Sequence, residues 1–464
     1  MKPFLKKVSG RNQSAKLMFG GGINTGNTPF TIGLNQGTYM RNVSPRKFPA
    51  LASTEGYAAY AAALTTPNGL GQRGNTILHV VDGTTWKYWD TGTSTYVNVQ
   101  TGLANATAQF DEFYYADGTL CTIMSNGTQR YMWDGTGAAT ALTGAPLSKV
   151  VVAHKQRLYW GLANAITYCV LDDPTDYTTA GEGGSGLIIV NLQGGITAMR
   201  SFDNHIIVWG DYGMFQLFGT DISDFALNQI KGKVGCVTQR ASVVSNTRLF
   251  FLGRAGVFLY STEPVLISQN ISTYIDDINW SYKNLICSGA TKNYLYFSVP
   301  YGTSQTTNNI TLVYDLEQNE WYVQDRGYKD FVQFDGKLYG VNNSGTIYQL
   351  EYGTTWAGTK IEWDFITPAF SGNNIEKFVS LAAIDLIMDM PGGSNLKVSY
   401  SDDIDGTETQ DWTAIKTVES SDFVKGIRIH VPMHNLYDKK FFRLRFAGTG
   451  ECVLHYVQMD YRTV

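Results

Sequence analysis

One short acidic stretch has the residue types and the spacing that metal chemistry uses. Asp402, Asp403 and Asp405 stand just before Gly406, and Trp412 closes the stretch. Such carboxylates before a glycine are found in calcium loops, because calcium prefers oxygen ligands and glycine allows the sharp turn. The stretch occurs only once in the chain. We interpret it as an Asp/Gly-rich hairpin turn, and calcium or glycan binding at residues 402–405 stays open as the alternative.

The rest of the chain offers no catalytic or cofactor motif. Gly20, Gly21 and Gly22 are not followed by the Gly-Lys-Ser/Thr of a phosphate loop. The HExxH and GxSxG patterns are absent, and the six histidines are scattered. His205 stands in an apolar run, where a histidine is more often a packed core residue than a catalytic one. The sequence therefore predicts a protein that is not an enzyme and uses no cofactor or metal.

The cysteines and the apolar runs indicate the cellular compartment in which the protein is made. The cysteines are far apart and contain no CxxC pair, which indicates neither a zinc site nor a disulfide framework. This usage is typical of a protein made in a reducing cytoplasm. The N-terminus has no apolar segment of a secretory signal, and no apolar run approaches the roughly 18 residues of a membrane span. The five cysteines are Cys121, Cys169, Cys236, Cys287 and Cys452.

Charge is distributed unevenly along the chain. The 36 Lys/Arg and 40 Asp/Glu residues give a formal net charge of −4. Residues 1–54 hold eight of the basic residues and no acidic one, so the remainder has 28 against 40, or −12. A basic arm on an acidic body favours docking onto an acidic surface or nucleic acid, and a solvated N-terminal extension is the alternative. The candidate neighbour- or DNA-contacting residues of the arm are Lys2, Lys6, Lys7, Arg11, Lys16, Arg41, Arg46 and Lys47.

Short strands and tight turns must position all of these residues. The chain contains 48 Gly, 28 Tyr and 10 Trp, but only 16% charged residues, which favours strands and turns over helices. Two units within residues 199–279 show the pattern most clearly. In each unit two apolar runs flank a glycine turn, at residues 210–213 and 253–256. Each unit is the signature of a β-hairpin.

The hairpin unit repeats along the chain. A period near 40–45 residues with about four short strands per unit is typical of β-propeller blades. A single four-stranded sheet cannot bury both of its faces, whereas blades packed around an axis can. The sequence predicts an all-β fold with a β-propeller of about seven degenerate blades, and a sandwich or β-helix of unrelated hairpins is the alternative. The units include Leu78, Leu120, Val150, His205, Leu249, Tyr294 and Phe334.

Two local features of the repeat region lead to separate predictions. Trp86, Tyr88 and Trp89 form an aromatic stripe that could stack on sugars from an exposed face. In a propeller such rings more often fill the wedge between blades, and we favour that interpretation. Residues 272–280 predict one short helix, with Ser272 as its N-cap and Ile275, Ile278 and Tyr282 on one face.

After Gly353 the pattern changes to runs with a polar residue at every second position, which indicates half-exposed strands. About 110 residues of this kind predict one β-sandwich. In these runs Arg428, Arg443 and Arg445 are expected to face outward. The predicted organisation is an extended basic N-terminal arm at 1–58, a β-propeller at 59–353 and a C-terminal β-sandwich at 354–464.

Several short motifs follow one another in a characteristic order. They are residues 19–25, Pro29-Phe30, Asn42-Val43, residues 155–161, Asp173-Pro174, residues 215–219, 235–237, 250–258, Ile267-Ser268, residues 313–315 and Trp321. In this order the chain resembles the phage tail-nozzle family, which includes the packaged-DNA stabilisation proteins of short-tailed phages and related virion β-propeller proteins of other tailed phages. The resemblance covers roughly residues 20–460 as a diffuse pattern. The chain departs from the family pattern in one basic segment, of which it has only Arg46-Lys47 and Gly56-Tyr57.

The resemblance implies a virion structural protein without catalytic activity. Members of the family form a homo-oligomeric, hexameric ring at the tail axis, below the portal and adaptor. The ring closes the channel on packaged DNA and attaches further tail proteins, and phage DNA passes through its lumen without sequence-specific binding. A location in the virion tail, after synthesis in the bacterial host cytoplasm, is implied. The acidic body is compatible with this role, because affinity for DNA rises with each phosphate that a protein neutralises.

Two other functions compete with this one. A receptor- or glycan-binding β-propeller at the tail periphery is the alternative, based on the aromatic residues and on a sandwich that looks lectin-like. A glycan-cleaving propeller enzyme needs a carboxylate pair in a central pocket, and the sequence offers no candidate pair.

Overall fold

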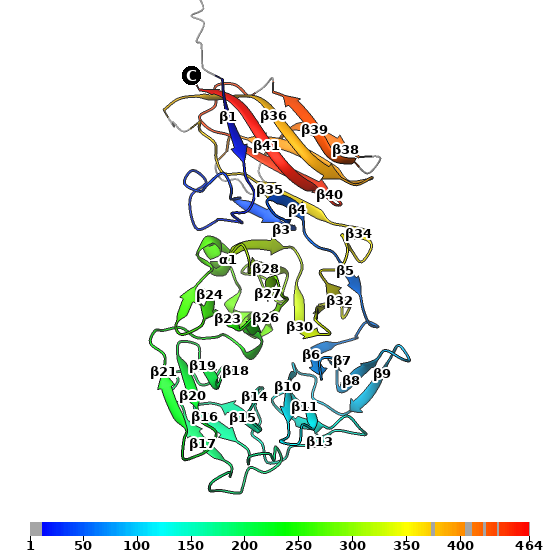
Figure 1. The fold of residues 1–464 in the computed structure, drawn as a ribbon, viewed down its shortest axis with the longest axis vertical. Coiled ribbons are helices and arrows are strands. Elements are labelled where there is room, and N and C mark those ends of the chain that lie inside the picture. Colours follow the sequence, from blue (N-terminus) through cyan, green and yellow to red (C-terminus); the bar gives the residue numbers. More distant parts are fainter. Residues whose placement is uncertain (1–11, 373–375, 404–410, 421–423, 434–435, 464) are drawn as a thin grey trace, which may run out of the picture.

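The computed structural model describes residues 12–372, 376–403, 411–420, 424–433 and 436–463. The chain forms a β-propeller and a β-sandwich that sits against one side of the propeller's rim (Figure 1). The predicted fold class, an all-β chain with a propeller of seven blades and a C-terminal sandwich, is confirmed.

Six of the blades are antiparallel sheets built from four consecutive strands, with the first strand of each innermost. In chain order their strands are β6–β9 (Pro67–Arg73, Ile77–Asp82, Thr85–Asp90, Thr95–Gln100), β10–β13 (Gln109–Tyr114, Leu120–Ser125, Arg130–Trp133, Thr140–Ala141), β14–β17 (Val150–His154, Arg157–Leu162, Ala165–Tyr168, Gly186–Ile189), β18–β21 (Ala198–Phe202, His205–Trp209, Met214–Phe218, Ala226–Gln229), β22–β25 (Ser242–Ser245, Arg248–Gly253, Gly256–Tyr260, Pro264–Leu266) and β26–β29 (Cys287–Ala290, Tyr294–Val299, Ile310–Asp315, Glu320–Gln324).

The seventh blade closes the ring with a strand from the beginning of the chain. Its first three strands are β30 (Tyr328–Phe334), β31 (Lys337–Asn342) and β32 (Ile347–Leu350), and β5 (Tyr57–Ala59) pairs antiparallel with β32 as the fourth. The ring is complete, because innermost strand β30 also packs against β6 of blade 1. Two minor strands, β33 (Thr355–Trp356) and β34 (Thr359–Lys360), extend this sheet beyond β5.

The seven hairpin units predicted from the sequence fall one in each blade. Local turn chemistry explains this agreement. Asp335 and Gly336, for example, link β30 to β31 with φ values of +51° and +66°, the left-handed pair that a tight hairpin turn requires. Apolar side chains of neighbouring blades then form the core between them, as Trp86 of blade 1 does with Met124 and Trp133 of blade 2.

The sandwich consists of two sheets that share one apolar core. The first sheet contains β3 (Val43–Lys47), β4 (Ala50–Ser53), β41 (Val453–Thr463), β36 (Val379–Met390) and β39 (Val424–Pro432), and β1 (Asn12–Leu17) pairs with β41. The second contains β2 (Tyr39–Arg41), β35 (Glu362–Ile366), β40 (Arg443–Thr449), β37 (Asn395–Ser401) and β38 (Thr413–Glu419). Leu386 and Val457 of the first sheet lie in one buried cluster with Val398 and Phe446 of the second.

The described part of the N-terminal arm contributes strands to both the propeller and the sandwich. Strands β1, β3 and β4 belong to the sandwich, and β5 belongs to blade 7. Strand β2 lies between β29 of blade 6 and β35 of the sandwich, so that one sheet of nine strands runs from the propeller into the sandwich. The arm is therefore extended, as predicted, but it is also the element that holds the two parts together.

The prediction that three arginines of the sandwich face outward is correct only for Arg428, whose side chain is 76% exposed. Arg443 is buried and donates to the hydroxyl of Thr38. Arg445 forms an ion pair with the fully buried Asp364. The sequence pattern failed here because the partners of these arginines come from other segments, Thr38 of the N-terminal arm for Arg443 and Asp364 of β35 for Arg445.

The predicted helix is shorter than expected. Helix α1 spans Ser272–Asp276, and the 3-10 turn η2 (Gln269–Ile271) leads directly into it. Its N-cap is Ile271, not Ser272, because the chain is already helical at Ser272. Ile275 and Ile278 are buried as predicted, whereas Tyr282 is exposed. The other 3-10 turns are η1 (Gln239–Ala241) and η3 (Trp280–Leu285), and no helix of the described chain is long and apolar enough to cross a membrane.

Candidate functional site on the propeller axis

The axis of the propeller contains a cavity of about 250 Å³. The innermost strands surround it, and its wall carries five charged side chains, two from β10 and one each from β18, η1 and β30. A central cavity with convergent polar groups is the first place to look for function in such a fold. The five charged residues are Asp111, Glu112, Arg200, Arg240 and Asp330.

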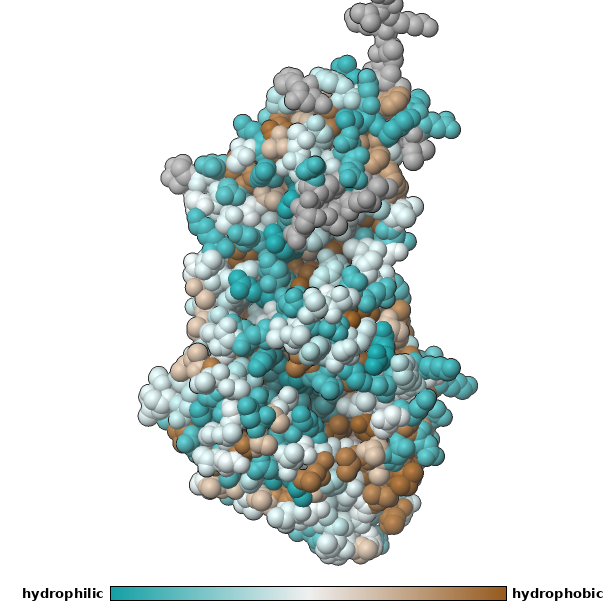
Figure 2. Space-filling model, turned by 180° about the vertical axis from the view of Figure 1, so that it is seen from behind, coloured by the Kyte–Doolittle hydropathy of each residue, from teal (hydrophilic) through white to brown (hydrophobic). Residues whose placement is uncertain are grey.

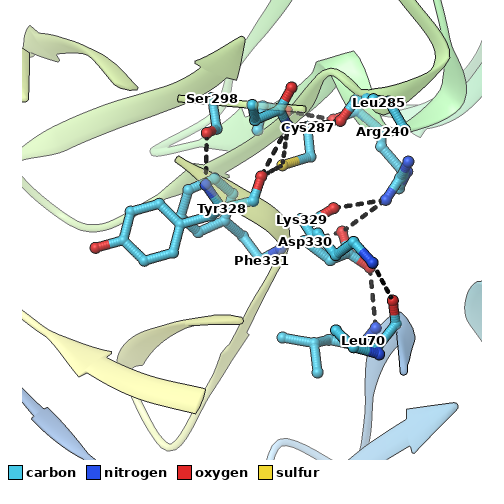
Figure 3. A network of polar contacts seen from close by, with 12 residues as sticks. Leu70, Arg240, Leu285, Cys287, Ser298, Tyr328, Lys329, Asp330 and Phe331 are labelled. Carbon is cyan, nitrogen blue, oxygen red and sulfur yellow. Dashed lines mark hydrogen bonds and ion pairs between the residues drawn. The ribbon is translucent and has the colours of Figure 1, made fainter. Parts of the chain in front are cut away.

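The two most buried acids each accept hydrogen bonds from the next blade. The Oδ2 atom of Asp330, on β30, accepts from the backbone amide of Leu70 on β6 at 2.9 Å (Figure 3). The Oδ2 atom of Asp111, on β10, accepts from the amide of Ala153 on β14 at 2.9 Å. Burial raises the pKa of both carboxyl groups. These hydrogen bonds connect each carboxylate to the neighbouring blade.

The two arginines act in the same way. Arg200, on β18, donates to the hydroxyl and the carbonyl of Ser242 on β22, at 3.1 and 2.9 Å. Arg240, on η1, donates to the carbonyl of Lys329 at 2.7 Å and lies 3.9 Å from the Asp330 carboxylate (Figure 3). Its other terminal nitrogen donates to the carbonyl of Asn284 at 2.9 Å. Arg240 therefore connects blade 7 to the segment that precedes blade 6.

Polar side chains bridge the four remaining blade junctions as well. Gln72 of blade 1 donates to Glu112 of blade 2 at 3.0 Å, and Ser288 of blade 6 donates to the carbonyl of Arg240 at 2.8 Å. We call this ring of contacts the axial belt. Its other two bridges are Gln239 with Val151 and Met199, and Asn308 with Tyr328.

The charges of the axial belt connect neighbouring blades. A nucleophile, an adjacent base and a group that orients the base would be needed for covalent catalysis. The carboxylates here accept from backbone amides, and the arginines donate to backbone carbonyls. Within the described ranges, no group of three or more His, Cys, Asp or Glu side chains is placed to hold a metal ion.

A pair of half-buried glutamates lies outside the axis, and the sequence did not reveal it. Glu351 accepts from the hydroxyl of Tyr296 at 2.8 Å, and Glu55 accepts from that of Tyr294 at 3.5 Å. Burial raises the pKa of both glutamates. The space beside Glu55 measures about 10 Å³, which is hardly enough for one water molecule. No substrate fits beside the pair.

The aromatic stripe of the first unit is part of the core, as we favoured. Trp86 is fully buried and donates from Nε1 to His79 Nδ1 at 3.0 Å. Tyr88 stacks on Trp133 of blade 2, with ring centroids 5.4 Å apart. Trp89 packs edge-on against Tyr96. Tyr88 and Trp89 are partly buried and pack against apolar clusters between blades, Tyr88 against the cluster that contains Trp86.

Two other predictions about single residues can be compared with the structure. His205 is buried and stacks on Phe218 at 4.7 Å, which confirms a packed histidine. Asp402 forms an ion pair with Lys439 at 2.5 Å. Residues 404–410, with Asp405 among them, lie outside the described residues, so the calcium alternative stays a prediction. All five cysteines are buried free thiols.

The basic residues of the arm have different surroundings. Arg41 forms an ion pair with Asp325 at 3.7 Å, and Arg46 forms one with Glu451 at 3.0 Å. The ammonium group of Lys16 lies 5.4 Å from the ring centre of Tyr456, and Lys47 is exposed. These contacts hold the arm on its own chain. Lys2, Lys6, Lys7 and Arg11 lie outside the described residues.

Comparison with known proteins identifies structural neighbours but no family. No protein-family model and no curated protein matches the chain. The solved structures similar to it include a streptogramin B lyase (11% identity, TM-score 0.43, 63% of this chain and 96% of that one). They also include virginiamycin B lyase of Staphylococcus aureus (12%, 0.43, 63% and 99%) and BamB of Moraxella catarrhalis (8%, 0.41, 67% and 94%). Both named bacterial proteins are β-propellers.

Proposed function

We propose that this chain is a structural protein of a tailed-phage virion, which forms a ring of identical copies at the tail axis. In this role it helps to close the channel on packaged DNA and attaches further tail components. The order of sequence motifs suggests the role. The main structural support is the nine-stranded sheet, because it joins propeller and sandwich through continuous strand pairing, as a structural component of a particle requires.

Within this sheet, Asn42 fixes the junction between blade 6 and the sandwich. Asn42 follows β2, is fully buried and adopts φ +56°. Its side-chain nitrogen donates to Asp325 at 2.8 Å and to the carbonyl of Glu362 at 2.7 Å, and its oxygen accepts from the amide of Asp325 at 3.1 Å. One residue thus satisfies groups from blade 6 and from the sandwich, which limits rotation between them.

An exposed apolar surface on blade 3 supports contact with a neighbouring copy. Leu187 and Ile189, on the outer strand β17, are 57% and 60% exposed. Hydrophobic residues gather near the lower right edge of the propeller in the view from behind (Figure 2). Exposed apolar patches commonly mark protein–protein contacts.

The experiment that tests the proposal combines assembly in solution with location in the particle. The purified chain should form a ring in multi-angle light scattering and negative-stain images, and cryo-electron microscopy should place it at the tail axis. Leu187→Asp with Ile189→Asp should weaken ring formation without unfolding the chain. Ile222→Asp, at an equally exposed apolar residue of blade 4, is the matched control. A chain that stays monomeric and is missing from virions would overturn the proposal.

A further inference from the structure

A second cavity opens where the innermost strands begin, between blades 1, 6 and 7. It measures about 230 Å³, far above the roughly 15 Å³ that a single water molecule requires. Arg240 borders both this cavity and the axial one, so its side chain stands between them. The lining residues that matter for binding are Arg240, Lys329, Asn308, Thr107, Thr306 and Thr307.

The cavity has an excess of positive charge. Its lining contains Arg240 and Lys329 and no acidic side chain. The nearest carboxylate is that of Asp330, which lies 3.9 Å from Arg240 but already accepts two backbone amides. Burial and the charge of Arg240 lower the pKa of Lys329 and of Lys149. An anion in the cavity would remove this repulsion.

Two deeply buried atoms of residues that line the cavity have no hydrogen-bond partner among the described residues. Arg240 is only 8% exposed, and its Nε–H donor is unpaired. Asn308 is 2% exposed, and its Oδ1 acceptor is unpaired. The amide nitrogen of Asn308 donates to the carbonyls of Leu285 and Tyr328, at 2.7 Å each, which fixes Oδ1 as the free atom. Buried polar atoms of folded proteins rarely stay unpaired.

The two unpaired atoms require different chemistry from a partner. The Nε–H of Arg240 requires an acceptor. The ammonium group of Lys329 donates to the carbonyl of Pro67 at 3.3 Å, which uses one of its three N–H groups, and its charge favours an anion. The Oδ1 of Asn308 requires a donor such as a hydroxyl group, because an anionic oxygen would be repelled there. The three threonine hydroxyls can donate or accept and can adapt to either group.

We propose that this cavity binds a small hydroxylated anion of monosaccharide size, with its carboxylate or phosphate at Arg240 and Lys329 and a hydroxyl group at Asn308. A sugar acid and a sugar phosphate share this chemistry. The site belongs to the propeller alone and does not rest on the ring-forming role. Loss of ring assembly and loss of ligand binding are therefore separate results.

The test is isothermal titration calorimetry of the full chain with four probes at equal ionic strength: D-glucuronate, D-glucose 6-phosphate, D-glucose and inorganic phosphate. Glucuronate or glucose 6-phosphate should bind at least about tenfold more tightly than glucose and phosphate, because only they supply both the charge and the hydroxyl groups. A further titration with an acidic oligosaccharide tests whether the site binds the end of a polymer or a free sugar. No heat of binding up to about 20 mM, or equal binding of glucose, would overturn the proposal.

Matched variants locate the site. Lys329→Met removes the cation while its backbone carbonyl still accepts from Arg240, and it should weaken binding of the preferred probe about tenfold. Lys337→Met, at an exposed lysine paired with Asp335, is the control and should leave the affinity unchanged. Equal losses in both variants would place the binding elsewhere and overturn the assignment. The comparison of probes on the unaltered chain decides the proposal even where a variant does not fold.

Discussion

At the scale of single residues, buried charges of this protein stabilise contacts between blades. Arg157 of blade 3 is fully buried, and one terminal nitrogen donates to the carbonyls of Cys169 and Gly184. Its other terminal nitrogen lies 3.6 Å from Asp221 of blade 4. A fully buried arginine beside a hairpin turn cannot be predicted from local pattern, because its partners, the carbonyls of blade 3 and the carboxylate of blade 4, are brought to it only by the folded blades.

Replacing Arg157 should therefore destabilise the fold strongly. Arg157→Ala is expected to lower the free energy of unfolding by about 3 kcal/mol, because buried carbonyls lose a charged donor and a cavity remains. Arg428→Ala, at an arginine that is largely exposed beside Asp385, should cost less than about 1 kcal/mol. Urea denaturation of both variants measures the difference, and similar losses would contradict this role of Arg157.

The pH dependence of stability should contain a contribution from Glu320. Burial raises the pKa of this carboxyl group from 4.5 to about 7, so the folded state binds its proton more tightly than the unfolded state does. Stability is then highest below about pH 4.5 and is lost as the pH rises through about 7. Glu320→Gln cannot titrate, and at pH 8 it should be more stable than the unaltered chain by about 1–2 kcal/mol, after discounting for partial exposure.

Thermal unfolding at pH 5 and pH 8 checks this prediction. The two proteins should differ little at pH 5 and clearly at pH 8. Glu317→Gln, at an exposed glutamate of the neighbouring turn, is the matched control. A stability difference that does not change with pH would show that Glu320 is not the titrating group.

At the scale of elements, the hairpins form from local signals, but the ring closes through a distant strand. Strand β5 is only three residues long, and it pairs with β32 nearly three hundred residues later in the chain. Tyr57 anchors it between Tyr348 and Trp356, with ring centroids 4.3 and 5.7 Å away. Nothing in the sequence around Tyr57 marks it as the last strand of blade 7, since its partner is set only once the ring has formed.

Tyr57→Ala should weaken the pairing of β5 with β32 that closes the ring. The loss of a buried aromatic ring is expected to cost about 3 kcal/mol or more and to expose blade 7 to proteolysis. Tyr352→Ala removes a largely exposed tyrosine from the turn that follows β32 and should have little effect. Limited proteolysis with mass spectrometry identifies the first cleavage sites. Cleavage that begins in another blade would contradict the closing role of β5.

At the scale of the whole molecule, the N-terminal arm determines how the parts are joined. Its strands complete the sandwich, bridge it to blade 6 and close blade 7. The sequence predicted three successive regions, whereas the structure shows that the first of them is shared between the other two. The ion pairs of Arg41 and Arg46 have the same effect, because each connects the arm to a distant part of its own chain.

The C-terminal region should consequently not fold by itself. A fragment of residues 354–464 lacks the strands β1 and β4 that pair with β41, and it lacks β2 beside β35. We expect this fragment to show poor dispersion in its NMR spectrum and no cooperative unfolding, because several strand edges and apolar faces are left uncovered. Addition of a peptide with residues 1–55 should restore order. A fragment that folds alone would contradict this view of the arm.

The sequence by itself determined the all-β class, the seven hairpin units and the change of pattern after Gly353, because strand periodicity and turn residues such as Asp335-Gly336 act over short distances. Only the tertiary structure decided which strand closes the ring, that Arg443 is buried and Arg445 pairs with the buried Asp364, and that charged residues form the axial belt and line the second cavity. Asp330 and Leu70, for example, are 260 positions apart. Their contact exists only because seven blades bring the two ends of the propeller together.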